Sequence, residues 1–196
     1  PLLEGGRRPP IEIDVEVGGV RVSGFLRDVY PKGQVDWRYS RLGGRHEIRF
    51  WVRHCLLGLL GERCTTFLAG RPAKDDDVRL AGFRPPGDPQ AILAELVRLY
   101  RAALRFPVPL FPESSRLYVA ELRRLGGEPD AKERAFRKVR EEFVKKRNGE
   151  GAFGDGADEY VVKLFGEREE PPEGRDFAAI ARAVFEPLLR HRDPES

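Results

Sequence analysis

The spacing of hydrophobic residues changes from a strand period to a helix period near residue 45, and this change most limits the fold. Ile11–Val17 alternates apolar with acidic residues, which is the pattern of a half-buried strand, and Gly18-Gly19 fits a two-residue hairpin turn. Residues 46–60 then place apolar side chains at every third or fourth position, as an amphipathic helix does. A chain that makes this switch packs helices on a sheet, so the sequence predicts the α/β class.

About five strands are expected to form one mixed sheet flanked by helices. The strand segments are residues 11–17, 20–30, 34–38, 64–69 and 78–83. Later helices are expected to begin at Asp88, Ser114, Asp130 and Asp176, the last of them interrupted near Pro187. We therefore expect a single domain over residues 1–196, with a sheet core and one helix in residues 1–85 and a mainly helical portion in residues 86–196.

The composition fits a domain that folds alone. Of the 196 residues 40% are hydrophobic, which is enough to form a sizeable core. No run of about 18 apolar residues and no leader pattern occurs, so we expect a cytoplasmic protein without a membrane contact. No phosphate-binding loop, calcium loop or His/Cys metal spacing is present, so neither a cofactor nor a small-molecule substrate is expected. Because the chain begins at Pro1 and contains no methionine, we expect it to be a fragment of a longer subunit.

Residues 22–38 have the outline of a metal-dependent nuclease site but lack two of its three groups. Such sites use carboxylates to hold Mg²⁺ and a lysine to orient the attacking water. Arg27 stands where the first carboxylate is expected, Asp36 can serve as the second, and Arg38 takes the position of the lysine. Arginine does not readily deprotonate and does not replace a lysine at such a site. We therefore expect a degenerate site without a catalytic residue or a metal ion.

Four arginines recur at every fourth position before and within the helix expected over residues 46–60. They are Arg41, Arg45, Arg49 and Arg53. One interpretation is that they form the solvated side of a surface helix. The other is that guanidinium groups one turn apart bind a DNA backbone or an acidic partner surface. The sequence leaves both interpretations open.

The segment from Phe106 to Ser115 is rich in proline and aromatic residues. Such a segment is usually a buried connector between helices. A rigid extended segment also loses little entropy on binding, so it suits a docking surface for a partner subunit. In this second interpretation, Phe111 and Tyr118 are the side chains expected to dock the partner.

Several short segments carry a resemblance to a known family. They are residues 23–26, 35–40, 49–56, 66–70, 109–115 and 154–160. Together they resemble the C-terminal domain of the exodeoxyribonuclease V gamma subunit, the RecC family. The likeness spans most of the chain, and its more specific parts are Pro109–Ser115 and the loop Gly154–Tyr160 that runs into a helix.

The resemblance implies a PD-(D/E)XK, or restriction-endonuclease-like, fold that has lost its catalytic residues. It also implies a bacterial complex in which RecB-like and RecD-like subunits are the partners and DNA is bound weakly by this chain alone. Our hypothesis is thus a non-catalytic nuclease-fold domain that scaffolds a DNA-repair helicase-nuclease complex. Two alternatives are an active metal-dependent nuclease that uses Asp36, and a protein-binding module unrelated to DNA.

Overall fold

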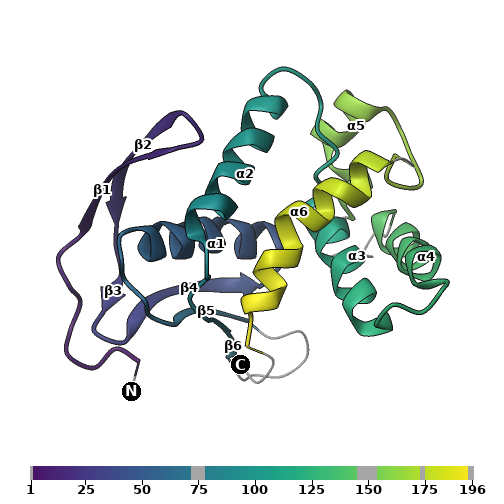
Figure 1. Ribbon diagram of the computed structural model, residues 1–196. Helices are drawn as coiled ribbons and strands as arrows, with labels where there is room; N and C mark the ends of the chain where they lie inside the picture. The colour runs from purple at the N-terminus through teal and green to yellow at the C-terminus, as the bar shows by residue number, and fades with distance from the viewer. Residues whose placement is uncertain (1, 72–77, 145–153, 173–174, 194–196) are drawn as a thin grey trace. The chain divides into compact units, whose positions relative to one another are not determined.

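The computed structural model describes residues 2–71, 78–144, 154–172 and 175–193, without the side chains of Arg41, Arg79 and Arg175. The chain divides into two compact units (Figure 1). Unit 1 comprises Pro1–Arg101 and Arg190–Ser196, and unit 2 comprises Ala102–Leu189. The helix expected to begin at Asp88 therefore belongs, as far as Arg101, to unit 1, which also contains the strands.

Unit 1 contains all the strands found among the described residues, together with two helices. The strands are β1 (Ile11–Val17), β2 (Val20–Leu26), β3 (Val29–Tyr30), β4 (Gly33–Arg41), β5 (Thr66–Arg71) and β6 (Arg79–Phe83), and the helices are α1 (Gly44–Leu59) and α2 (Pro89–Ala103). The predicted N-cap of α2 is confirmed, because the Asp88 carboxylate accepts a hydrogen bond from the Ala91 backbone N–H at 2.9 Å.

The expectation of a single sheet is wrong, because the strands form two sheets. β1 and β2 pair with each other as an antiparallel hairpin through the predicted glycine turn, from Ile11 opposite Leu26 to Val17 opposite Val20. The strand expected over residues 20–30 breaks after Leu26, where Asp28 has a φ of 59°. A left-handed residue cannot continue a strand, so β3 starts a new pairing with β4.

The second sheet, here called the main sheet, has the order β3-β4-β5-β6 and is mixed as predicted. β4 and β5 run parallel, and the other two pairs are antiparallel. α1 forms the crossover between β4 and β5 and contacts the side of β5 that carries Thr66 (Figure 1). At the far edge, residue Arg192 forms a bridge with Phe83 of β6, so the last described residues of the chain extend this sheet.

The helix predicted over residues 46–60 is confirmed as α1, but its buried side differs from the apolar stripe seen in the sequence. Ile48 and Val52 are only half-buried, whereas Glu47, Trp51 and His54 are fully enclosed. The side chains packed around Trp51 come from distant parts of the chain. Its ring centroid lies 5.3 Å from that of His54, 6.1 Å from Phe83 and 5.6 Å from His191.

His54 links α1 to both β5 and the segment after β6. Its Nε2 lies 3.0 Å from the Arg84 carbonyl oxygen, which can only accept, so Nε2 carries the proton. Its Nδ1 then accepts a hydrogen bond from the Thr66 hydroxyl at 2.9 Å. Burial disfavours the charged imidazolium and lowers the pKa of His54 from 6.5 to about 4.

Acidification is expected to destabilise unit 1 through His54. In the unfolded chain His54 takes up a proton near pH 6.5, whereas in the folded chain it stays neutral until about pH 4. Its contribution is therefore complete above pH 6.5 and is lost as the pH falls, by about 3 kcal/mol at pH 4. Urea unfolding at several pH values measures this loss. A His54→Gln variant should show a flatter pH dependence between pH 4.5 and 6.5, and an unchanged slope would contradict the assignment.

Unit 2 is helical throughout its described residues. Its elements are α3 (Pro112–Leu125), α4 (Ala131–Phe143), the short 3₁₀ helix η1 (Asp155–Ala157), α5 (Glu159–Phe165) and most of α6 (Arg175–His191). α3 begins at Pro112, two residues before the predicted start, and ends as predicted at Gly126, which has a φ of 61°.

The core of unit 2 is a cluster of aromatic rings around Phe111. The ring centroids of Phe143, Phe165 and Phe177 lie 5.4, 5.3 and 6.2 Å from that of Phe111. The chain passes close to this cluster at Gly156, where an added Cβ would overlap the Phe143 ring. The next residue back, Asp155, accepts a hydrogen bond from the Ser114 backbone N–H at 2.7 Å and so holds η1 against the start of α3.

The final helix differs from its prediction, because α6 continues through Pro187 without interruption. A proline inside a helix removes one backbone hydrogen bond. Val184, Phe185 and Leu188 around it are buried, so the packing of these side chains compensates for that loss. Within the part of the chain that the structure describes, no helix is long and apolar enough to cross a bilayer.

Candidate functional site

Of the residues predicted to form a degenerate nuclease site, Asp36 on β4 makes contacts with two arginines. Arg53 from α1 donates a hydrogen bond to the Asp36 carboxylate at 3.0 Å, and Arg38 Nη2 lies 3.9 Å from the same oxygen. Alternation along β4 places Asp36 and Arg38 on the face of the main sheet that α1 covers. All three side chains are only partly exposed, so solvent weakens these ion pairs less than it would at an open surface.

This arrangement does not fit a divalent cation. A hydrolytic Mg²⁺ site needs several oxygen ligands with negative charge. Around Asp36 the structure instead brings two guanidinium groups to one carboxylate, and these would repel a cation. No group of three or more His, Cys, Asp or Glu side chains with metal-binding geometry occurs among the described residues.

Arg27, the third predicted site residue, lies outside the strands, directly after β2. Its side chain is exposed, and its carbonyl oxygen accepts a hydrogen bond from the Gln34 side chain at 2.9 Å. The neighbouring Asp28 sits in the left-handed bend and lies 3.4 Å from Arg7 Nε. The described contacts do not connect Arg27 to Asp36, so the predicted frame is only partly assembled.

The structure divides the arginines that recur every fourth residue into three groups. Arg41 lies at the end of β4 rather than on the helix, and its side chain is outside what the structure describes. Arg45 and Arg49 are exposed on α1. Arg53 is turned inward to Asp36. Of the three whose side chains the structure describes, Arg45 and Arg49 are therefore the exposed ones.

The two side chains predicted to dock a partner are part of the core of unit 2. Phe111 is 1% exposed and Tyr118 is 3% exposed, and Tyr118 packs on Phe177 with ring centroids 5.6 Å apart. Neither can contact a partner while the unit is folded, so the docking prediction has to move to other side chains. In the same proline-rich segment Phe106 is 69% exposed.

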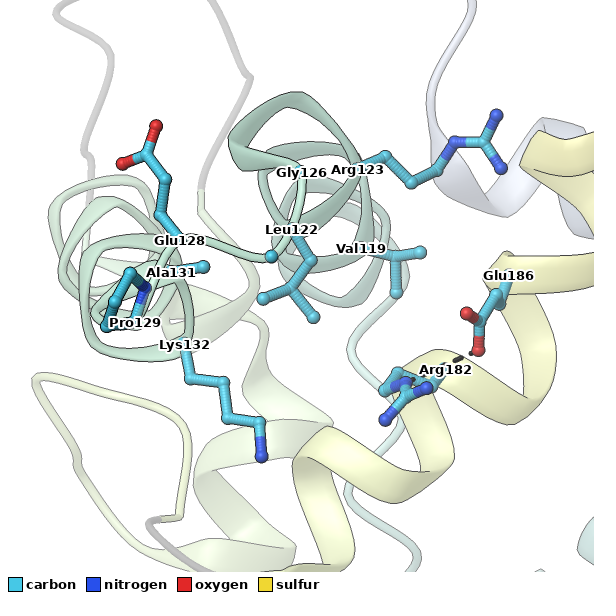
Figure 2. A pocket seen from close by; sticks show the side chains of 11 residues that line it. Val119, Leu122, Arg123, Gly126, Glu128, Pro129, Ala131, Lys132, Arg182 and Glu186 are labelled. Carbon is cyan, nitrogen blue, oxygen red and sulfur yellow. Dashed lines mark hydrogen bonds and ion pairs between the residues drawn. The ribbon is translucent and has the colours of Figure 1, made fainter.

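Unit 2 also has a pocket that the sequence analysis did not anticipate. It has a volume of about 540 Å³ and lies between the α3–α4 turn and α6 (Figure 2). Val119 and Leu122 form an apolar side, and Lys132 extends from the start of α4. On α6, Arg182 and Glu186 pair with each other at 3.3 Å. Because its walls carry both signs of charge, the pocket does not by itself select a ligand.

A pair of exposed aromatic side chains on β4 was not predicted from the sequence. Trp37 alternates with Asp36, so it lies on the opposite face of the main sheet. Tyr39 follows in the stretch between Trp37 and Arg41, where the pairing of β4 with β5 is irregular, and both ends of that stretch pair with the same side of β5, at Ala69 and Arg71. Large aromatic residues in a strand are ordinarily expected to be buried, and no residue pattern indicated that these two are exposed.

Comparison with known proteins identifies the family. The family model described as the RecC C-terminal domain matches residues 1–123. The RecBCD enzyme subunit RecC of Mycolicibacterium smegmatis is 33% identical over 124 residues, which is 62% of this chain and 11% of the relative. The corresponding subunit of Escherichia coli is 32% identical over 106 residues, which is 53% of this chain and 9% of the relative. These matches confirm the resemblance expected from the sequence, and the chain belongs to the RecC C-terminal domain family.

Proposed function

We propose that this chain is a non-catalytic, nuclease-fold domain of a RecBCD-type DNA-repair complex. In this role it scaffolds RecB-like and RecD-like subunits and contacts DNA in the cytoplasm. The family assignment supports the proposal, and the relatives it matches are named as RecC subunits of the RecBCD enzyme. The chain spans about a tenth of the length of these relatives, 11% and 9%, so it would act as one domain of a longer subunit.

The observation that carries the proposal is the environment of Asp36. A working site would present a carboxylate to a metal ion and a lysine to water. Here Oδ2 of the carboxylate is held by Arg53 and lies near Arg38, and these two guanidinium groups would repel a metal ion. The parallel pair β4 and β5 joined by α1 supports a degenerate PD-(D/E)XK core.

We expect no nuclease activity from the 196-residue chain. The test is incubation with linear single-stranded and double-stranded DNA in the presence of Mg²⁺ or Mn²⁺. Asp36→Ala and the matched control Asp14→Ala, which removes an exposed carboxylate on β1, should behave like the unmodified chain. Cleavage that survives Asp14→Ala but disappears in Asp36→Ala would show an active nuclease and refute the proposal. Cleavage by all three preparations would identify a contaminant.

The DNA contact in this proposal is assigned to Arg45 and Arg49. Both are exposed on α1, whereas Arg53 is turned inward to Asp36. Contacts of this type act through counterion release, so the affinity should fall steeply as salt rises. The partner contact is assigned to unit 2, beginning with Phe106.

A further inference from the structure

The face of the main sheet opposite α1 carries two exposed aromatic side chains, although Val35 on the same face is buried. Trp37 is 74% exposed and Tyr39, two residues further along β4, is 91% exposed. On the covered face, Thr66 and Leu68 of β5 are buried. Exposed aromatic side chains that gather on one face of a sheet indicate a binding surface.

Two more aromatic side chains share this face. Phe67 on β5 is paired in register with Val35, which lies on the same side as Trp37. Tyr30 on β3 is opposite Gly33, which also belongs to this side. Both are half-buried. We call the set Tyr30, Trp37, Tyr39 and Phe67 the aromatic face. It crosses three neighbouring strands.

The charges around the aromatic face favour an anionic ligand. Its side of the described strands carries no carboxylate, since Asp36 points toward α1. Arg71, at the end of β5 and on the same side as Phe67 by alternation, is exposed. Arg63, just before the start of β5, is also exposed. Cationic side chains thus lie at both ends of β5, and the aromatic side chains lie between them.

We propose that the aromatic face binds single-stranded DNA by stacking its bases on Trp37 and Tyr39 while the arginines contact its phosphates. Aromatic platforms flanked by cations bind single strands in this way because every base has a π-face. The bases of a duplex are stacked on each other and do not reach such a face. Trp37 and Tyr39 are each exposed, which allows neighbouring bases of an extended strand to stack on them separately.

This inference rests on the proposed function only in choosing DNA as the nucleic acid. It differs from the contact assigned to Arg45 and Arg49, which lie on α1 and would bind phosphates alone. A polypeptide partner is the other class of ligand for an apolar sheet face. The aromatic face with arginines at both ends and no carboxylate matches the charge of a nucleic acid strand better than that of an average protein surface.

The chain provides its own reporter for the test. It has two tryptophans, of which Trp37 is exposed and Trp51 is fully buried. Titration of the 196-residue chain with an oligo-dT of about 12 nucleotides at low salt should quench part of the tryptophan emission in a saturable manner. This quenching should be absent in Trp37→Phe, because the exposed indole that reports it has been removed. The variant still has an aromatic ring at this position on which a base can stack.

The variants locate the site. Tyr39→Ala should weaken binding at least about fivefold, whereas the matched control Tyr100→Ala, an exposed tyrosine on α2, should leave it unchanged. Binding can also be followed by the anisotropy of a labelled oligomer, so Trp37→Ala can be compared directly. Loss of binding in Trp37→Ala and Tyr39→Ala, with an unchanged circular dichroism spectrum, supports the inference.

Three outcomes overturn it. The first is the absence of any saturable binding of oligo-dT. The second is binding that disappears in the double variant Arg45→Glu, Arg49→Glu and is unchanged in Tyr39→Ala, which would leave the DNA contact of the proposed function intact on α1. The third is self-association in sedimentation that Trp37→Ala abolishes, without quenching by oligo-dT, which would make the face a protein interface. None of these outcomes affects the nuclease test, so the two proposals fail separately.

Discussion

Arg192→Ala is expected to lower the free energy of unfolding of unit 1 by about 3–5 kcal/mol. Glu47 on α1 is fully buried, with 0% of its side chain exposed, and Arg192 Nη1 lies 3.2 Å from its carboxylate. The variant leaves a buried negative charge without its cation, and this loss costs far more than the loss of a surface ion pair. Urea unfolding measures the change, with Trp51 as the fluorescent probe in a Trp37→Phe background.

The second half of a double-mutant cycle separates this charge effect from lost packing. Glu47→Gln combined with Arg192→Ala removes both charges, so it should recover most of the stability lost in Arg192→Ala. Arg190→Ala is the matched control, because Arg190 is exposed and the hydrogen bond that it accepts from Arg84, at 3.2 Å, goes to its backbone carbonyl oxygen, which the substitution keeps. If Arg192→Ala lowered the free energy of unfolding no more than Arg190→Ala does, the ion pair between Glu47 and Arg192 would contribute nothing to the stability of unit 1.

Phe111→Ala is expected to lower the stability of unit 2 by about 3–5 kcal/mol, because it removes the ring around which the aromatic cluster packs. Both tryptophans lie in unit 1, so circular dichroism of the helices of unit 2 is the suitable measurement. The matched control is Phe106→Ala, since that ring is 69% exposed and its loss should change stability by no more than about 0.5 kcal/mol.

The same two variants test the revised docking surface. Phe106→Ala should weaken co-purification of the chain with the RecD-like subunit while its stability is unchanged. Phe111→Ala should act on association only through unfolding. Equal stability of Phe111→Ala and the unmodified chain would contradict the core assignment. Unchanged association in Phe106→Ala would exclude Phe106 from the interface.

The parts of the fold that depend on local periodicity were predicted well from the sequence. The hairpin from Ile11 to Leu26 follows from strict alternation and a glycine pair that accepts positive φ, here 56° at Gly18 and 72° at Gly19. The division into two sheets was missed, because it depends on the left-handed conformation of Asp28. Aspartate adopts that conformation less often than glycine, so no residue type in the segment signalled the break.

The contact at the centre of the candidate site was not predicted from the sequence. The sequence indicated Asp36 as the remaining carboxylate of a lost metal site, and Arg53 as one of four arginines on a helix surface. In the structure Arg53 donates a hydrogen bond to Asp36 at 3.0 Å. They are far apart in sequence, and only the packing of α1 against the main sheet brings them together. Phe111 was misjudged for a related reason, since a proline-rich segment has no helical or strand period that distinguishes its buried side from its exposed side.

The bridge between Arg192 and Phe83 has a consequence for the order in which the chain can fold during synthesis. Unit 1 is completed by residues that are synthesised after all of unit 2. The Arg84 backbone N–H donates a hydrogen bond to the His191 carbonyl oxygen at 2.8 Å, and the Asp193 backbone N–H donates one to the Gly82 carbonyl oxygen at 2.9 Å. Until they emerge, the Glu47–Arg192 ion pair and the bridge to Phe83 are missing, while all of unit 2 is already available to fold. The N-terminal unit thus reaches its final state after the unit that follows it.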